Sequence, residues 1–371
     1  MARTVLDAAV ALLIGAAGGG VFYLIGAPLP WTLGSLAAVA TVAISGGPWV
    51  MPAPVREFAR PVVGILAGSA FTPEVVASIG DWWGAIVFVA AYTLIVSALG
   101  WLFFRKLCRL DPVTAYFAST PGGLGELTLL GGALGGSMRT LVTIHSVRIV
   151  VVVFTVPFFL QLMLGSDLSG AALPSHATPD PLLADWLILI ACGVAGYLAG
   201  RLLRLTGGAM IMAMLFSAGV HGTGLTLVLP PGWLIAVVQV VIGAVAGARF
   251  AGIRWLELRS TVLQALVWAV VLLATAVVAA EAGALLFARP FAALMLALAP
   301  GGMAEMMIIS YALGIETAFV VTCQLCRSFM VVSFAPIIFR LLGIAPAAPA
   351  TPAVPAKDKR KLPPPDDPRP D

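Results

Sequence analysis

The sequence predicts an all-α polytopic membrane protein built from two homologous repeats, and three observations lead to this prediction. Of the 371 residues, 60% are hydrophobic and 10% are charged, against roughly 25% charged in an average soluble domain. Several apolar windows each supply the roughly 20 residues that a membrane-spanning helix needs. The third observation is a polar motif, Pro-Gly-Gly-x-x-Glu, which occurs twice inside apolar sequence.

The longest apolar windows are expected to be membrane-spanning helices. Five of them stand out, at residues 5–25, 83–104, 139–164, 261–287 and 317–342. The first follows Met1-Ala-Arg-Thr, as the apolar part of a signal peptide would, but it is long and leads directly into another apolar segment. We therefore expect a retained helix there.

A single shift relates the two halves of the chain. Pro300 minus Pro121 is 179, and the same shift places Glu126 on Glu305. It also aligns Gly64 with Gly243, Gly68 with Gly247, Phe71 with Phe250, Arg148 with Arg327 and Pro157 with Pro336. We therefore predict a first repeat over 1–164, a linker over 165–184, a second repeat over 185–344 and a disordered Pro-rich tail over 345–371.

The relative orientation of the repeats depends on the interrupted segment that contains the motif, 112–136 in the first half. If that segment crosses the membrane, each half has six spans and the halves are parallel. If it enters and returns, each half has about five spans and the second half is inverted. A returning segment, with both termini in the cytoplasm, leaves Arg289 outside, whereas a crossing segment sends Arg201, Arg204, Arg249, Arg254 and Arg259 outward. The positive-inside rule therefore favours inverted repeats.

The motif itself predicts a polar site at membrane depth. Irregular backbone is tolerated there only where protein buries it or water reaches it, because unpaired N–H and C=O groups cost several kcal/mol each. Proline stops the incoming helix, the glycines permit close approach, and a new half-helix begins with its N–H groups at the break. The candidate binding residues at the two breaks are Pro121, Gly122, Gly123, Pro300, Gly301 and Gly302.

Ionisable side chains accompany each break. Glu126 and Glu305 fall in the first turn of the new half-helix, where a carboxylate either exchanges protons or caps the helix dipole. Arg148 and Arg327 each follow the matching Glu by 22 residues (148 − 126 and 327 − 305). A buried Arg stays charged and needs an anionic or carbonyl partner, so a fixed Glu–Arg bridge and contact with substrate are both open.

Two further polar residues stand three positions before these arginines, on the same helical face: His145 and Gln324. They complete the candidate site. His221, in a Gly-rich apolar segment, aligns with Val42 and is interpreted as a buried polar residue with satisfied hydrogen bonds.

Metal and cofactor chemistry are not expected. The chain has three histidines, one of them in the linker, and its four cysteines include a single Cys323-x-x-Cys326 pair. Neither set supplies a metal centre of the usual kind. There is also no soluble basic module that would read nucleic acid. We therefore expect no enzyme activity, cofactor, metal or nucleic-acid partner, and leave the oligomeric state open.

The motif and its context resemble one family. Two Pro-Gly-Gly-x-x-Glu segments, each followed by an apolar helix with an Arg, on a duplicated chain, are similar to the AbrB family of bacterial inner-membrane proteins. The resemblance covers nearly all of the chain up to the tail. It implies a bacterial inner (cytoplasmic) membrane location and brings labels such as regulator of gene expression and ammonia monooxygenase, without a settled activity.

Two functions follow as expectations. The first is secondary transport or export of a small anionic or zwitterionic solute, coupled to H+, because broken helices with ionisable groups are typical of secondary transporters. The alternative is a membrane-embedded regulator that affects gene expression indirectly and has no transport activity. A monooxygenase would need a copper or iron site, for which the histidines are too few.

Overall fold

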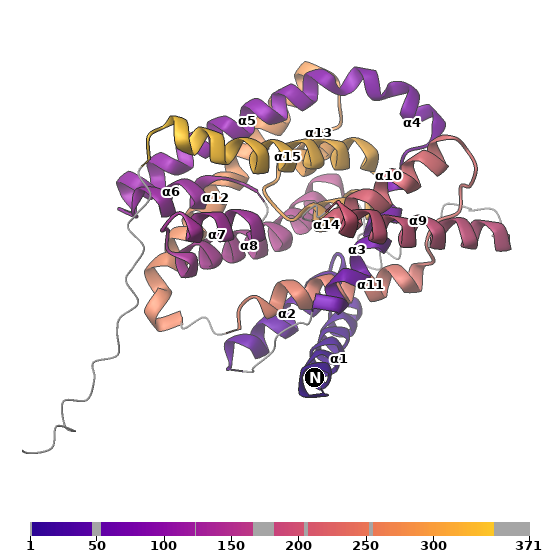
Figure 1. The fold of residues 1–371 in the computed structure, drawn as a ribbon, viewed down its shortest axis with the longest axis horizontal. Coiled ribbons are helices and arrows are strands. Elements are labelled where there is room, and N and C mark those ends of the chain that lie inside the picture. Colours follow the sequence, from indigo (N-terminus) through magenta and orange to yellow (C-terminus); the bar gives the residue numbers. More distant parts are fainter. Residues whose placement is uncertain are drawn as a thin grey trace, which may run out of the picture.

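The computed structural model describes residues 2–46, 53–122, 124–165, 182–203, 207–251 and 255–344. These ranges are α-helical and contain no strand, which confirms the all-α prediction (Figure 1). The first half contains α1 (Ala2–Leu24), α2 (Pro30–Ile44), α3 (Ala53–Gly68), α4 (Pro73–Ser78), α5 (Trp83–Leu102), α6 (Pro112–Ser119), α7 (Leu124–Ala133) and α8 (Met138–Leu164). The second half contains α9 (Leu183–Leu202), α10 (Gly208–Gly222), α11 (Gly232–Ala248), α12 (Trp255–Phe287), α13 (Phe291–Leu298), α14 (Met303–Ala312) and α15 (Thr317–Leu341).

Six of the described helices are long and apolar enough to cross a membrane. They cover Leu6–Leu24, Pro73–Leu107, Met138–Leu164, Leu183–Leu202, Leu258–Phe287 and Thr317–Leu341. All five windows predicted from the sequence are among them. Large apolar side chains on their outer faces, such as Leu13 and Leu285, are exposed. These helices indicate a multi-pass protein in a lipid bilayer.

The count of about five spans in each half stays a prediction, because several of the expected spans are short helices. The helices α2, α10 and α11 have 15 to 17 residues, fewer than a membrane-spanning helix usually has. The apolar segment 61–79 is not one helix either, because α3 ends at Gly68 and α4 begins at Pro73. Thr72 starts the new helix by accepting a hydrogen bond from the Val75 N–H group, with proline in the first helical position.

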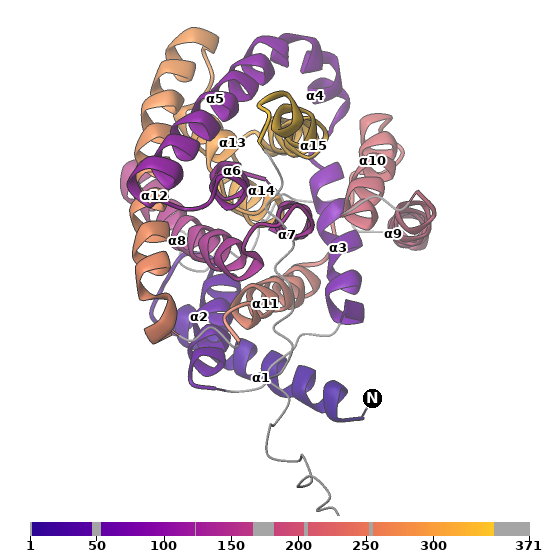
Figure 2. The same ribbon diagram turned by 60° about the vertical axis from the view of Figure 1, so that its left-hand side comes forward.

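Helix bounds in the two halves correspond at the offset found in the sequence. Adding 179 to the bounds of α6, 112 and 119, gives those of α13, 291 and 298. The same sum takes α7, 124 to 133, onto α14, 303 to 312. The halves are also intertwined, because α2 packs on α11 of the second half while α10 packs on α3 of the first (Figure 2).

Small residues make the close packing between helices of the two halves possible. A Cβ atom on Gly64 would stand 3.0 Å from the Ala213 Cβ atom of α10, and one on Gly243 would stand 2.9 Å from the Ser35 Cβ atom of α2. Both glycines therefore let two helix backbones approach closely, as is common between helices in membranes. The alignment of these two glycines in the sequence reflects a packing requirement that each half meets against the other.

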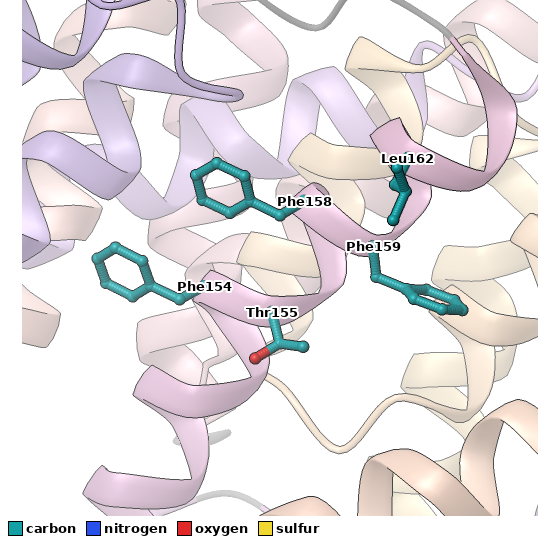
Figure 3. A pocket seen from close by; sticks show the side chains of 5 residues that line it. All are labelled: Phe154, Thr155, Phe158, Phe159 and Leu162. Atoms are coloured by element: carbon teal, nitrogen blue, oxygen red, sulfur yellow. The ribbon is translucent and has the colours of Figure 1, made fainter.

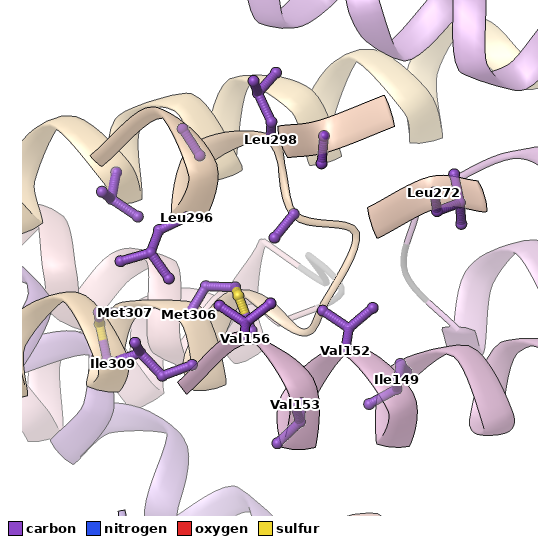
Figure 4. Packing of buried hydrophobic residues seen from close by; sticks show 14 of the residues in the cluster. Ile149, Val152, Val153, Val156, Leu272, Leu296, Leu298, Met306, Met307 and Ile309 are labelled. Atoms are coloured by element: carbon purple, nitrogen blue, oxygen red, sulfur yellow. The ribbon is translucent and has the colours of Figure 1, made fainter. Parts of the chain in front are cut away.

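The hydrophobic core surrounds the second helix break. Leu296 and Leu298 of α13 and Met306, Met307 and Ile309 of α14 are buried and belong to one cluster with residues of α8 (Figure 4). The residues of α8 in that cluster include Ile149, Val152, Val153 and Val156. The core thus fixes α13 and α14 of the second half against the long helix α8 of the first.

Candidate functional site

The first Pro-Gly-Gly segment folds as a hairpin. Helix α6 ends at Ser119 and α7 begins at Leu124, and Asp111 caps α6 by accepting the Thr114 N–H group at 2.8 Å. Beyond α7, Ser137 donates its N–H group to Thr114 Oγ1 at 2.7 Å, so the end of the segment returns to its beginning. The turn at Pro121 and Gly122 is therefore the tip of a hairpin whose two ends meet.

The two ends of the second segment also meet, but there an ion pair joins them. Arg289 precedes α13 and Glu316 follows α14, and Arg289 Nη1 lies 3.1 Å from Glu316 Oε2. The guanidinium carbon of Arg289 also lies 5.5 Å from the ring centroid of Phe319 on α15. In both halves, then, the chain turns back at the motif. Whether these hairpins cross the membrane or enter and return stays a prediction.

Each break packs against the long helix of the other half. A Cβ atom on Gly122 would stand 2.5 Å from Val331 Cγ1 of α15, and one on Gly301 would stand 3.2 Å from Val152 Cγ1 of α8. The two contacts are equivalent, because 331 − 152 is 179, as is 301 − 122. Since Val152 lies one helical turn after Arg148, the second break also lies near the arginine of the first half.

Arg327 and Gln324 hold the end of α13. Arg327 Nη1 donates to the carbonyl groups of Leu298 and Ala299, both at 3.0 Å, and of Ala297 at 3.4 Å. Gln324 Nε2 donates to the Leu296 carbonyl at 2.6 Å. The last carbonyl groups of a helix lack intrahelical partners and form the negative end of its dipole. The pair therefore caps α13 and stabilises the broken helix.

In the second half, Glu305 and Arg327 do not form the Glu–Arg bridge that was one of the two open alternatives. Glu305 is buried, and its carboxylate lies over Gly302, the N-cap residue of α14, rather than against Arg327. Within the described ranges Glu305 makes no ion pair with Arg327. The carboxylate stands at the positive end of α14, which is the capping position that the sequence left open as the alternative. Arg327 instead pairs with the cluster of carbonyl acceptors at the end of α13.

Arg148 occupies the equivalent place in the first half and has fewer bonds. Its side chain is 2% exposed, and Nη2 donates to the Gly122 carbonyl group at 3.3 Å. Nε and Nη1 have no hydrogen-bond partner in the described part of the chain. Both halves therefore hold a buried arginine beside the helix break, Arg148 at Gly122 and Arg327 at Ala299.

His145 is completely buried beside the Phe117 carbonyl group. Neither of its ring nitrogens has a hydrogen bond of good geometry to a described residue. Phe117 corresponds to Leu296, since 117 + 179 is 296, so His145 and Gln324 face equivalent carbonyl groups. Of the two residues, Gln324 forms a hydrogen bond to its facing carbonyl group, and His145 forms none of good geometry with a described residue.

The described candidate residues are gathered around the two breaks. Pro121 and Pro300 are buried at the turns, next to Gly122 and Gly301. Gly123 and the side chain of Glu126 lie outside the described residues. Within the described ranges no group of three or more His, Cys, Asp or Glu side chains could hold a metal ion.

Two buried polar side chains of these segments were not among the predicted site residues. Thr128 of α7 and Ser146 of α8 are buried, and their hydroxyl groups have no partner among the described residues. Their position inside the motif helices, next to the other candidates, was the available signal. His221, by contrast, is satisfied as predicted: Nδ1 lies 2.8 Å from the Ser217 carbonyl oxygen and Nε2 lies 3.2 Å from that of Val228.

Two hollows in the described part of the chain are lined mostly by apolar side chains. One of about 410 Å³ is lined by Phe154, Thr155, Phe158, Phe159 and Leu162 of α8 (Figure 3). A second, of about 260 Å³, lies between α8 and α12. Phe158 and Leu162 are exposed on a membrane-spanning helix, so this region suits lipid chains rather than a polar solute.

Comparison with known proteins gives a family and two relatives. The model of the family described as "Transition state regulatory protein AbrB" matches residues 31–343. The chain is 26% identical over 357 residues to "Uncharacterized protein YhjN" of Bacillus subtilis (strain 168), covering 89% of this chain and 92% of that protein. It is 24% identical over 317 residues to "Putative regulator AbrB" of Escherichia coli (strain K12), covering 85% and 90%. No solved structure matches the chain significantly.

Proposed function

This chain belongs to the AbrB family, and we propose that it is a secondary transporter or exporter of a small anionic or zwitterionic solute. One observation supports this most directly. Two helix breaks, each packed on the other half, lie beside two buried arginines. A charged and polar centre of this kind inside an apolar protein is typical of a substrate or ion pathway.

The electrostatics of the centre favour an anionic group. Burying a cation is unfavourable unless opposite charge or hydrogen-bond acceptors balance it. The carbonyl groups at the end of α13 balance Arg327, while the Glu305 carboxylate is turned toward its own helix. The remaining positive charge would bind a carboxylate or similar group of the solute.

Coupling to protons is part of the proposal. Glu305 is a buried carboxylate at a helix break, next to the glycine that starts α14. A carboxylate in that position can take up a proton when the site opens to one side and release it on the other. We place the protein in the bacterial inner membrane with both termini in the cytoplasm, as the positive-inside rule favours, and assign it no enzyme activity.

Flux measurements test the proposal. The full-length protein, reconstituted in liposomes, is supplied with organic acids and amino acids in the presence and absence of a pH gradient. We expect uptake or counterflow of at least one anionic or zwitterionic solute that depends on the protein and responds to the pH gradient. Absence of protein-dependent flux for all of these solutes would contradict transport.

The name of the Escherichia coli relative favours a second candidate, a membrane-embedded regulator that acts on gene expression without transporting a solute. This alternative predicts that deleting residues 345–371 abolishes function while Glu126→Gln and Glu305→Gln leave it intact. Transport predicts the opposite pattern. Comparing the three variants in a strain that lacks the native protein separates the two.

A further inference from the structure

The two halves differ in the hydrogen bonds of their buried arginines. We infer that Arg148 binds an oxyanion directly, whereas Arg327 is a structural residue that positions the helix break. This inference deepens the proposed function, because it assigns the anionic group of the solute to one half of a site that the sequence presents as symmetric.

Arg327 has little capacity left for a ligand. Nη1 contacts three carbonyl groups at the end of α13, and Nη2 donates to Gln324 Oε1 at 2.5 Å. Nε is the one side-chain nitrogen of Arg327 that lacks a described partner. A ligand that recruited the Nη atoms would have to displace these bonds and leave buried carbonyl groups unpaired, which is unfavourable.

Arg148 has the opposite balance. Among the described residues, one bond, from Nη2 to the Gly122 carbonyl group at 3.3 Å, engages its guanidinium group. Nε and Nη1 are buried and unpartnered among the described residues, although buried donors are nearly always paired in folded proteins. A charged group with spare donors at a helix break is therefore poised for a ligand with several acceptor oxygens.

The difference between the halves has a cause in the sequence. Gln324 is an amide, so it donates to the Leu296 carbonyl group and accepts from Arg327 at the same time. The equivalent residue of the first half is His145, whose rigid ring forms neither bond with the described residues. Replacing the amide by an imidazole thus leaves Arg148 without the side-chain acceptor that occupies Arg327.

The chemistry predicts the class of the ligand. A guanidinium group pairs best with planar or tetrahedral oxyanions, through two parallel charge-assisted hydrogen bonds. The break beside Arg148 is followed by α7, a helix of 10 residues, whose N-terminal N–H groups also favour negative charge. A carboxylate or a phosphate group fits both features.

Thermal unfolding of the purified full-length protein in detergent tests the inference. The probes are succinate, glutamate and inorganic phosphate, with succinamide and glutamine as uncharged counterparts and sodium chloride as the ionic-strength control. Arg148→Gln and Arg327→Gln are compared with Arg340→Gln, which changes an exposed arginine near the end of α15. If a glutamine variant does not fold, Arg148→Lys or Arg327→Lys takes its place in the comparison.

We expect at least one of the anions, and neither uncharged counterpart, to raise the Tm of the wild-type protein. Arg148→Gln should weaken the apparent affinity for that anion by at least about tenfold, because a hydrogen bond to a charged group is lost. Arg327→Gln should lower the Tm without ligand and keep the increase caused by the anion. Arg340→Gln should change neither the Tm without ligand nor the increase in Tm caused by the anion.

Three results would overturn the inference: no anion stabilises the wild-type protein, Arg148→Gln keeps the full response, or Arg327→Gln abolishes it without lowering the Tm. A double variant tests the alternative that Arg148 pairs with the Glu126 carboxylate rather than with a ligand. If Glu126→Gln and Arg148→Gln together cost no more stability than either alone, the two side chains pair with each other, and the inference fails.

The same variants separate this inference from transport. An anion response that depends on Arg148, without flux of any solute through the wild-type protein, would contradict transport and support the binding site. Flux that is unchanged in Arg148→Gln, together with no anion response, would contradict the binding site and support transport.

Discussion

Val331 of α15 lies against Gly122 at the first helix break, with its Cγ1 atom 2.5 Å from the place where a Cβ atom would stand. The equivalent pair, Gly301 and Val152, makes a similar contact at the second break. Neither glycine has a positive φ angle. These motif glycines are therefore required for close approach between the halves, not for an unusual backbone conformation.

Replacing Gly122 by alanine should destabilise the protein. The new methyl group would collide with Val331 Cγ1 at 2.5 Å and with Leu127 Cδ1 at 2.7 Å. Overpacking of this kind costs about 1–3 kcal/mol. Chemical or thermal unfolding in detergent measures the loss, and solute flux should fall with it.

Gly125→Ala is the matched control for Gly122→Ala. It stands in α7, three residues from Gly122, and no atom lies within 4 Å of the place where its Cβ atom would be. Because alanine is a better helix former than glycine, the control should leave the stability unchanged or raise it slightly. Equal losses for Gly122→Ala and Gly125→Ala would show that the contact with Val331 is not required.

The position of Glu305 over Gly302 gives a second prediction. A Cβ atom on Gly302 would stand 2.6 Å from the Glu305 carboxyl carbon, so Gly302→Ala must displace the carboxylate from the start of α14. We expect a cost of about 0.3–2 kcal/mol for Gly302→Ala, because the displaced carboxylate no longer stabilises the positive end of α14. The double variant with Glu305→Ala should cost less than the sum of the single changes, because the collision is then absent.

Unfolding free energies of the two single variants and the double variant measure this coupling. Glu281→Ala, which removes an exposed carboxylate of α12, is the control and should show no coupling with Gly302→Ala. Additive losses for Gly302→Ala and Glu305→Ala would mean that the carboxylate does not occupy the position over Gly302.

The ion pair between Arg289 and Glu316 should contribute modestly to closing the second hairpin. Both side chains are partly exposed, at 22% and 32%, and such pairs are worth about 0.2–1 kcal/mol. A double-mutant cycle with Arg289→Gln and Glu316→Gln should therefore give a small coupling energy that decreases as salt is added. A coupling energy that does not change with salt would exclude a solvent-screened bridge.

Inverted repeats predict which loops are accessible from each side of the membrane. On a background without native cysteines, a cysteine at Ser175 should be labelled from the periplasmic side, and a cysteine at Arg254 should not. Both positions lie outside the described residues, so the test is independent of the contacts above. Labelling of both cysteines from the same side would contradict inversion.

The sequence alone determined the fold class and the place of the breaks. Long apolar windows predict the α1, α5, α8, α12 and α15 helices because hydrophobic composition over about 20 residues leaves little alternative to a spanning helix. Proline at positions 121 and 300 predicts the helix breaks because it cannot continue the backbone hydrogen bonds of the incoming helix. These are local effects, and a local pattern suffices to predict them.

The tertiary structure decided how the charges are paired. The sequence offers Arg327 two acceptors, the Glu305 carboxylate and the carbonyl groups at the end of α13, and spacing cannot choose between them. The hairpin brings those carbonyl groups within 3.0–3.4 Å of Arg327, so they pair with it. The alignment also makes Arg148 and Arg327 look equivalent, whereas the replacement of Gln324 by His145 makes them different. Hydrogen bonds depend on distances and angles between segments far apart in the chain, and only the packed structure fixes those.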